Sequence, residues 1–196
     1  NRLGVVLVPD NRALFTQLLK HAFETGRRYS RTFALLFIDL DRFKQINDSL
    51  GHAGGDLLLK EMAARIVACV RSSDVVARLG GDEFVVLVQE VAGKQQIAAV
   101  ARNILAAAIR PLQISGQEVR VTASVGISTF PGDGEDEQLL MKNADIAMYQ
   151  AKEEGKNNFQ FYTAALKSNT VEKLALESHL RHAVERSEFD VFAIVV

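Results

Sequence analysis

Acidic side chains stand at two places where an apolar run of the chain ends or turns. Asp39 and Asp41 follow an almost wholly apolar segment, and Asp82 and Glu83 follow two consecutive glycines. If these segments are neighbours in one sheet, three or four carboxylates meet at its edge and repel one another unless a cation binds there. Hard oxygen ligands of this kind suit Mg²⁺ or Mn²⁺ carrying phosphates. Two ordinary acidic loops are the alternative interpretation.

Basic and amide side chains follow the first acidic pair. Lys44 lies just after Asp41, where the amides that open a short helix can hold a phosphate. Asn47 and Asp56 flank a glycine-rich turn, and such side chains can donate to and accept from the amide edge of guanine. A helix end and a helix cap are the alternative roles of this pair. The Walker phosphate loop and the dinucleotide glycine fingerprint are both absent from the sequence.

The elements that must position these residues follow from the hydrophobic periodicity. An apolar strand that ends at Asp39 is expected to be buried on both faces. Gly80-Gly81 joins two short β-rich runs, and glycine at both turn positions predicts a tight hairpin. Helices interleaved with strands predict an α/β fold with a mixed central sheet flanked by helices. We predict helices over residues 11–28, 56–71, 97–109, 136–152 and 171–186, and strands over 32–39, 75–79, 82–88, 119–127 (half-buried) and 159–162.

Length and composition bound the remaining questions. The 196 residues favour one domain plus a tail, and a net charge of -1 argues against a broad nucleic-acid or membrane surface. The single cysteine, Cys69, lies in an apolar helical run and is expected in the core; it suits a reducing, cytoplasmic location, although the full-length protein could carry a membrane anchor. The apolar run 192–196 ends the sequence abruptly, so we expect a piece of a longer protein.

Four sequence blocks resemble one known family. The run Arg78-Leu-Gly-Gly-Asp-Glu-Phe84 resembles the signature hairpin of GGDEF domains, and residues 37–56 resemble the substrate segment of that family. Residues 123–127 and 143–152 also match. The resemblance implies a nucleotide-cyclase or polymerase-palm type of fold. It further implies a diguanylate cyclase, which condenses two GTP molecules into cyclic di-GMP and two pyrophosphates on a two-fold symmetric homodimer.

The resemblance also assigns a role to each matching side chain. Asp39, the Leu40 carbonyl, Asp82 and Glu83 bind the metal ions, and Glu83 helps to deprotonate the attacking ribose hydroxyl. Asn47 and Asp56 bind guanine, whereas Phe43, Lys44, Arg78, Lys152 and Lys156 surround the phosphates and the reacting groups.

A second ligand site is implied upstream of the hairpin. Arg71 and Asp74 resemble the inhibitory product site of the family. Arginine can donate two parallel hydrogen bonds to guanine or to a phosphate, and aspartate can accept hydrogen bonds from guanine. Arg102 on the next helix is a candidate second contact. The resemblance thus implies inhibition by cyclic di-GMP, and a surface ion pair at a helix end is the alternative.

The sequence departs from the family in three places. The usual leader before Asn11 is replaced by a divergent one over residues 1–10, and Lys156 stands where the family usually has arginine. The match covers residues 11–162; residues 163–196 resemble the linker helix and the start of an EAL phosphodiesterase domain, with a plain terminal helix as the alternative. Two rival functions remain: a GTP-binding module that regulates an attached phosphodiesterase, and a cyclic di-GMP receptor that uses Arg71 and Asp74 alone.

Overall fold

The computed structural model describes residues 6–7 and 12–166 of the chain. The chain divides into two compact units, Asn1–Thr163 and Ala164–Val196, and only the helical residues 164–166 of the second unit are described. The helix predicted over residues 171–186 lies outside the described residues. The elements in chain order are β1 (Val6–Leu7), α1 (Arg12–Tyr29), β2 (Phe33–Leu40), α2 (Phe43–Ala68), β3 (Val75–Gly80), β4 (Glu83–Val88), α3 (Lys94–Ala108), β5 (Leu112–Ile114), β6 (Gln117–Val119), β7 (Ala123–Phe130), α4 (Glu137–Glu153) and β8 (Phe159–Phe161).

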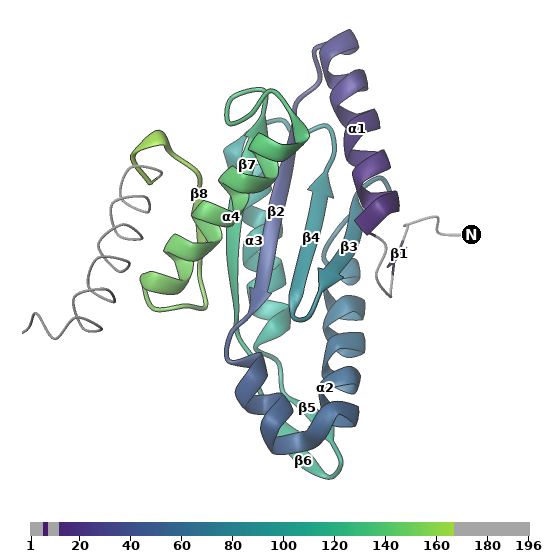
Figure 1. Ribbon diagram of the computed structural model, residues 1–196, viewed down its shortest axis with the longest axis vertical. Helices are drawn as coiled ribbons and strands as arrows, with labels where there is room; N and C mark the ends of the chain where they lie inside the picture. Colours follow the sequence, from purple (N-terminus) through teal and green to yellow (C-terminus); the bar gives the residue numbers. More distant parts are fainter. Residues whose placement is uncertain (1–5, 8–11, 167–196) are drawn as a thin grey trace, which may run out of the picture. The chain divides into compact units, whose positions relative to one another are not determined.

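Six of these strands form one mixed sheet in the order β1-β3-β4-β2-β7-β8 (Figure 1). The central strand β2 pairs antiparallel with β4 on one side and with β7 on the other. The outer pairs, β1 with β3 and β7 with β8, are parallel. All 8 residues of β2 are buried, which confirms the prediction of a strand covered on both faces. The predicted α/β fold with a mixed, helix-flanked sheet is therefore correct.

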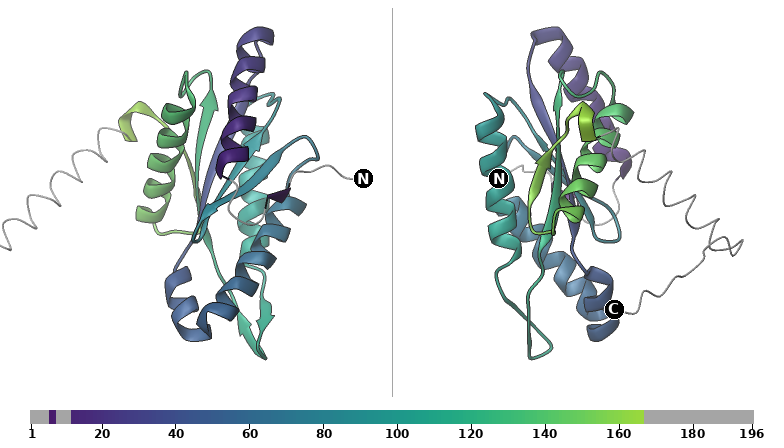
Figure 2. Two further views of the ribbon diagram at one scale, coloured as in Figure 1. Left: turned by 45° about the vertical axis from the view of Figure 1, so that its right-hand side comes forward. Right: turned by 90° about the vertical axis from the view of Figure 1, so that its left-hand side faces the viewer.

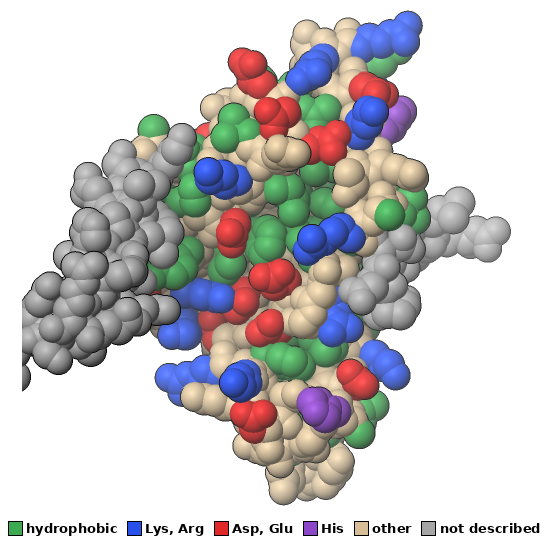
Figure 3. Space-filling model, viewed as in Figure 1, with side chains coloured by type: hydrophobic (Ala, Val, Ile, Leu, Met, Phe, Trp, Pro, Cys, Tyr) green, Lys and Arg blue, Asp and Glu red, His purple; other side chains and the backbone are tan. Residues whose placement is uncertain are grey.

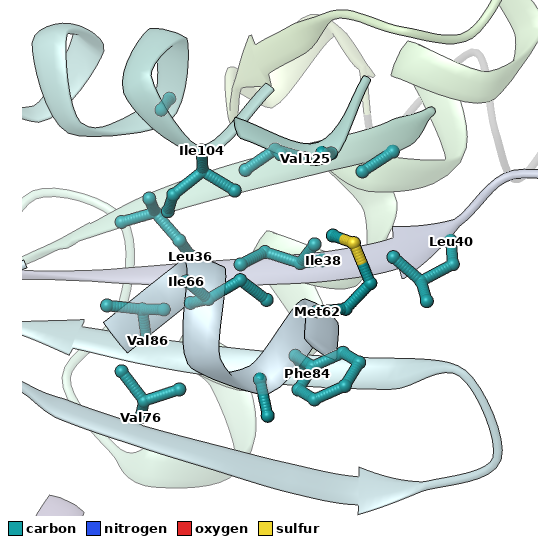
Figure 4. Packing of buried hydrophobic residues seen from close by; sticks show 14 of the residues in the cluster. Leu36, Ile38, Leu40, Met62, Ile66, Val76, Phe84, Val86, Ile104 and Val125 are labelled. Carbon is teal, nitrogen blue, oxygen red and sulfur yellow. The ribbon is translucent and has the colours of Figure 1, made fainter. Parts of the chain in front are cut away.

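Two helices cover each face of the sheet (Figures 1 and 2). Successive side chains of a strand point to opposite faces, so β2 contributes alternately to two hydrophobic clusters. Leu36 and Ile38 pack with α2 and α3, and Figure 4 shows Ile38 beside Met62 of α2. Leu35 and Phe37 pack on the other face with α1 and α4. Burial on both sides fixes the register of β2 and therefore the positions of the acidic residues at its end.

Two predicted elements need correction. Of the strand predicted over residues 119–127, Val119 ends β6 of a separate two-stranded sheet, residues 120–122 belong to no strand, and β7 begins at Ala123. β7 is buried on both faces apart from the half-buried Thr129, since α4 covers one face and the opposite core cluster covers the other. The hairpin of β5 and β6 turns at Ser115 and Gly116, which both have positive φ angles (51° and 80°). Strands of 3 residues carry too little periodicity to be recognised in the sequence.

The second helix begins earlier than the sequence pattern indicates. It starts at Phe43, and the predicted start at Asp56 lies within it. Gly51 has φ 74° and ψ 169° and kinks the helix, so the glycine-rich segment interrupts the helical periodicity without ending the helix. The remaining helix ends agree with prediction to within a few residues, and the Asp136 side chain caps α4 by accepting from the Leu139 amide.

Candidate functional site

The hairpin of β3 and β4 brings the two acidic pairs together. β2 and β4 pair so that Asp39 lies directly opposite Glu83. The amide of Leu40 donates to the carbonyl of Asp82 at 3.3 Å, which joins the end of β2 to the turn of the hairpin. The turn itself consists of Gly81 and Asp82, one residue later than predicted, and Gly80 lies at a register shift of the ladder. The predicted neighbourhood of Asp39, Asp82 and Glu83 is thus present.

The electrostatics of these carboxyls reflect their crowding. Burial raises the pKa of Asp39 above its usual value; Lys152 opposes the rise, and Asp82 adds to it. Burial also raises the pKa of Glu83, and the charges of Asp145 and Asp39 raise it further. Clustered carboxylates of this kind favour either protonation or a bound cation.

Helix α4 supplies the charged groups on the other side of the site. Lys152 Nζ lies 2.8 Å from Asp39 Oδ2, so this lysine neutralises part of the acidic cluster. Asp145 lies on the same helix and keeps an exposed surface, yet burial of its carboxyl raises its pKa. Figure 3 shows acidic side chains gathered between α4 and the turn of the β3–β4 hairpin, with lysine and arginine side chains beside them. The site is therefore an acidic patch with a basic border.

A divalent cation fits the chemistry of these donors. The groups nearest to the hairpin turn are carboxylates, which are the hard oxygen ligands that such cations prefer. Their pKa values are raised first by burial and then by the charges of neighbouring carboxylates. Within the described part of the chain, however, no three acidic, histidine or cysteine residues are already arranged as a complete set of metal ligands. Asp39 is instead paired with Lys152. A cation that took both oxygens of Asp39 would have to displace this ion pair.

The residues predicted to bind guanine lie on the two sides of the kink in α2. Asn47 Nδ2 lies 3.2 Å from His52 Nδ1, and a Cβ atom on Gly55 would lie only 2.1 Å from Asn47 Oδ1. Gly55 is therefore required for the position of the Asn47 side chain. Asp56 follows it on the exposed surface of the helix. The kink at Gly51 lets the segment turn between the two predicted guanine ligands.

The predicted phosphate-binding residues come from two separate segments. Phe43 and Lys44 form the first turn of α2, and Arg42 before them has the left-handed φ angle of 58°. Lys156 lies in the loop after α4, also with a left-handed φ angle, and is exposed. Arg78 has a structural contact, because its Nε donates to the Gly81 carbonyl at 2.8 Å and braces the hairpin turn.

Two residues of the predicted inhibitory site, Arg71 and Asp74, lie just before β3, at the far end of the β3–β4 hairpin from its turn, and the third, Arg102, lies on α3. Asp74 is buried, and its two carboxylate oxygens accept from the backbone amides of Arg71 and Gln89, each at 3.0 Å. Asp74 therefore shapes the turn before β3. The Arg71 and Arg102 side chains are exposed on different elements. The alternative of a surface ion pair between Arg71 and Asp74 does not describe this geometry, in which the Arg71 amide is the donor to Asp74.

Sequence reasoning missed one charged residue of the site, Asp145. Its position was visible in the sequence, because it lies two helical turns before Lys152 and therefore on the same face of α4. Asp41 was included in the acidic cluster, but its carboxylate oxygens accept hydrogen bonds from Thr122 and Ser124. Cys69 is half-buried at the end of α2 and packs against the edge of the core.

Comparisons with known proteins agree with this arrangement. The family model described as "Diguanylate cyclase, GGDEF domain" matches residues 10–158. The chain is 47% identical over 178 residues, or 91% of its length, to the bifunctional diguanylate cyclase/cyclic di-GMP phosphodiesterase MucR of Pseudomonas aeruginosa, of which it covers 26%. It is 38% identical over 93% of its length to the cyclic di-GMP phosphodiesterase NbdA of the same organism, of which it covers 23%.

A solved structure supports the same assignment. The crystal structure of the GGDEF domain of PA1120 (YfiN or TpbB) from Pseudomonas aeruginosa superposes with a TM-score of 0.77 at 39% identity, covering 81% of this chain and 99% of that domain. The chain belongs to the GGDEF domain family of diguanylate cyclases. It spans about a quarter of the length of the two curated relatives described above. In the described residues, every helix is too short or too polar to cross a lipid bilayer.

Proposed function

We propose that this domain is a diguanylate cyclase that condenses two GTP molecules into cyclic di-GMP. The observation that carries the proposal is the register of the central sheet, which sets Asp39 directly opposite Glu83 beside the hairpin turn. In each of two steps, the 3′-oxygen of one GTP forms a bond to the α-phosphorus of the other. The bond between the α- and β-phosphates breaks, and pyrophosphate leaves with its electron pair.

Each group of the site has a task in this reaction. Asn47 and Asp56 bind the guanine edge, while the amide of Phe43 and the side chains of Lys44 and Lys156 hold the phosphates. Glu83, opposite Asp39 in the sheet, accepts the proton of the 3′-hydroxyl. Arg78 holds the shape of the turn. Lys152 pairs with Asp39 until substrate enters and then faces the phosphates.

Magnesium or manganese is the proposed cofactor. Asp39, the Leu40 carbonyl, Asp82 and Glu83 would hold it, and a bound divalent ion stabilises negative charge on phosphate oxygens. The prediction is that turnover requires added Mg²⁺ or Mn²⁺ and is lost on chelation.

Cyclisation needs two copies of the domain. One site positions one GTP, and each nucleotide must present its 3′-hydroxyl to the other, so two domains must face each other about a two-fold axis. A single domain is expected to bind GTP without forming product. The dependence of the rate on protein concentration tests this directly, because a rate per molecule that does not rise with concentration contradicts the requirement for a dimer.

Substitution of the acidic residues tests the site assignment. Asp82→Ala and Glu83→Ala are expected to abolish synthesis of cyclic di-GMP, measured by chromatography of the reaction products. Glu118→Ala is the matched control, because Glu118 is an exposed glutamate on β6 that pairs only with Arg120 among the recorded ion pairs of the described residues. Near-normal synthesis by Asp82→Ala or Glu83→Ala would refute the assignment.

Inhibition by the product is a second part of the proposal. The turn that Asp74 holds between α2 and β3 presents the Arg71 side chain to solvent. There it can donate two parallel hydrogen bonds to a guanine or a phosphate of cyclic di-GMP. Arg102 on α3 is the proposed second contact. Arg71→Ala is expected to weaken inhibition by added cyclic di-GMP, and unchanged inhibition would remove this role from Arg71.

The full-length protein is proposed to be a tandem GGDEF and EAL protein. The similarity to MucR extends over 178 residues, which is more than the 10–158 span of the family model and includes part of the segment after β8. A GTP substrate also agrees with the cytoplasmic location expected from the sequence.

NbdA is named only as a phosphodiesterase, which supports the second candidate function, a GTP-binding regulatory module without synthesis. GTP binding without product formation by the dimer would favour that module, and cyclic di-GMP binding without GTP binding would favour a receptor.

A further inference from the structure

Asp41 is a buried carboxylate with a complete set of donors just beyond β2. Its residue surface is 4% exposed. Thr122 Oγ1 donates to Oδ2 at 2.6 Å, and Ser124 Oγ donates to Oδ1 at 2.7 Å. The backbone amide of Asn157 donates to Oδ2 at 3.2 Å. Because an ionised carboxylate is costly to bury without such partners, these three hydrogen bonds define one position for the carboxylate.

The third of these donors belongs to a strained loop. Gly155, Lys156 and Asn157 have the consecutive φ angles 108°, 65° and 49°. Two of them are not glycine, and residues with a Cβ atom adopt this left-handed region at an energetic cost. Such a conformation persists only where surrounding contacts hold it. The hydrogen bond from the Asn157 amide to Asp41 is a contact of this kind, and it links the loop to the sheet over 116 residues of sequence.

A second contact holds the loop from the side of α4. The Lys156 amide donates to the Ala151 carbonyl at 3.1 Å, and Asn158 Nδ2 donates to the same carbonyl, also at 3.1 Å. These bonds tie the loop to the helix that precedes it. Asp41 ties it to the strands, so the Lys156 backbone is held between two parts of the fold.

Asp41 also fixes the start of α2. Its own amide donates to the Thr122 carbonyl at 2.8 Å, and the next residue, Arg42, has a left-handed φ angle of 58° that directs the chain into α2. Asp41, Arg42 and Lys156 all line one cavity of about 470 Å³. Asp41 therefore stands between the two segments to which the proposed function assigns the phosphates: it directly precedes the first turn of α2 in the chain, and its side chain holds the Lys156 loop.

We propose that Asp41 is a positioning residue that sets the affinity for the terminal phosphates of GTP by fixing the Lys156 loop against the first turn of α2. It does not itself contact the nucleotide. This inference rests on the proposed function, since it takes GTP as the ligand. The hydrogen bonds of the Asp41 carboxylate go to Thr122, Ser124 and Asn157, and Asn47 contacts His52, so recognition of the base is expected to be independent of Asp41.

The test compares two ligands that differ in the terminal phosphates. The probes are GMP and the GTP analogue with a methylene group between the α- and β-phosphates, which cannot release pyrophosphate. Asp41→Ala in the 196-residue chain is expected to raise the Kd of the analogue at least tenfold and to change the Kd of GMP less than twofold. Asp41→Asn keeps one carbonyl oxygen for the Asn157 amide and is expected to restore the Kd of the analogue to within about threefold of wild type.

Asp133→Ala is the matched control for a general structural effect. Asp133 is partly buried and, like Asp41, accepts two hydrogen bonds from close donors: the amide and hydroxyl of Thr129 lie at 2.7 and 2.6 Å, at the opposite end of β7. It is expected to leave both Kd values unchanged. The positioning role would be overturned if Asp41→Ala weakened the binding of GMP and of the analogue equally. It would also be overturned if Asp133→Ala weakened the binding of the analogue as much as Asp41→Ala does.

Amide hydrogen exchange separates this inference from the proposed function. Asp41→Ala is expected to accelerate exchange of the Lys156 and Asn157 amides at least tenfold, and Asp133→Ala is expected to leave it unchanged. If the wild-type chain binds neither ligand, the proposed function fails, while exchange still decides whether Asp41 holds the loop. Unchanged exchange in Asp41→Ala would refute the inference whatever the ligand affinities are.

Discussion

Gly126, in the middle of β7, packs against α4 so closely that no other residue fits. A Cβ atom built there would lie 1.9 Å from the Ala144 carbonyl oxygen and 2.1 Å from the Met148 amide nitrogen. Real Cβ contacts essentially never fall below 3.0 Å, so Gly126→Ala requires the strand and the helix to separate by at least about 1 Å. Both clashing groups belong to the backbone of α4 and cannot turn aside as a flexible side chain would.

The cost of this separation follows from ordinary overpacking. Inserting a methyl group into a packed core typically costs about 1–3 kcal/mol, and a clash with rigid backbone belongs at the upper end or above it. We therefore expect Gly126→Ala to lower the free energy of unfolding by about 3 kcal/mol or more. Because the same helix carries Asp145 and Lys152, the ion pair of Lys152 with Asp39 is expected to weaken as well.

Urea unfolding followed by circular dichroism measures this effect. The midpoint is expected to fall without a change in the slope, which signifies lost stability with no change in the surface exposed on unfolding. Gly132→Ala is the matched control, because its Cβ would meet only Thr129 Oγ1, at the ordinary contact distance of 3.7 Å. A Gly126→Ala protein within about 0.5 kcal/mol of wild type would refute the close packing of β7 on α4, since unstrained glycine-to-alanine changes shift stability by only about 0.4–1 kcal/mol.

Two further predictions concern the rest of the fold. Arg65 donates hydrogen bonds to the carbonyls of Ala107, Ala108, Arg110 and Pro111 at the end of α3. Arg65→Ala is therefore expected to lower the free energy of unfolding in urea by about 2–3 kcal/mol, whereas Arg120→Ala, which loses only an exposed ion pair, is expected to lower it by less than about 0.5 kcal/mol. Equal losses of stability in the two variants would contradict this prediction. Burial raises the pKa of the Cys69 thiol, so iodoacetamide at pH 8 is expected to alkylate it more slowly in the folded chain than in urea, and equal rates would contradict the half-buried position.

The part of the fold that the sequence predicted is the part with strong local patterns. An apolar run before Asp39 indicated a central strand, and the glycine pair before Asp82 indicated the hairpin. α2 was placed too late because Gly51, Gly54 and Gly55 interrupt its periodicity, although the chain only kinks there. The β5–β6 hairpin was missed because its strands have 3 residues each. These errors arise where tertiary packing overrides a weak local signal.

The sequence named candidate residues for the site but not their contacts. The resemblance named Asp39 and Lys152 separately, and only the fold shows that they form an ion pair. Asp41 looked like a member of the acidic cluster, whereas its partners Thr122, Ser124 and Asn157 lie more than 80 residues away in the sequence. Hydrogen bonds of this sequence separation depend on the packing of strands and loops, so no local pattern could reveal them.

Synthesis of cyclic di-GMP from GTP tests the central claim most directly. The chain, at concentrations where it dimerises, is incubated with GTP and Mg²⁺. The products are separated by chromatography and identified by mass spectrometry. Cyclic di-GMP with two pyrophosphates for each molecule formed is the predicted result, together with its loss in Glu83→Ala. GTP bound by the dimer but left intact would contradict the account and make the domain a binding module.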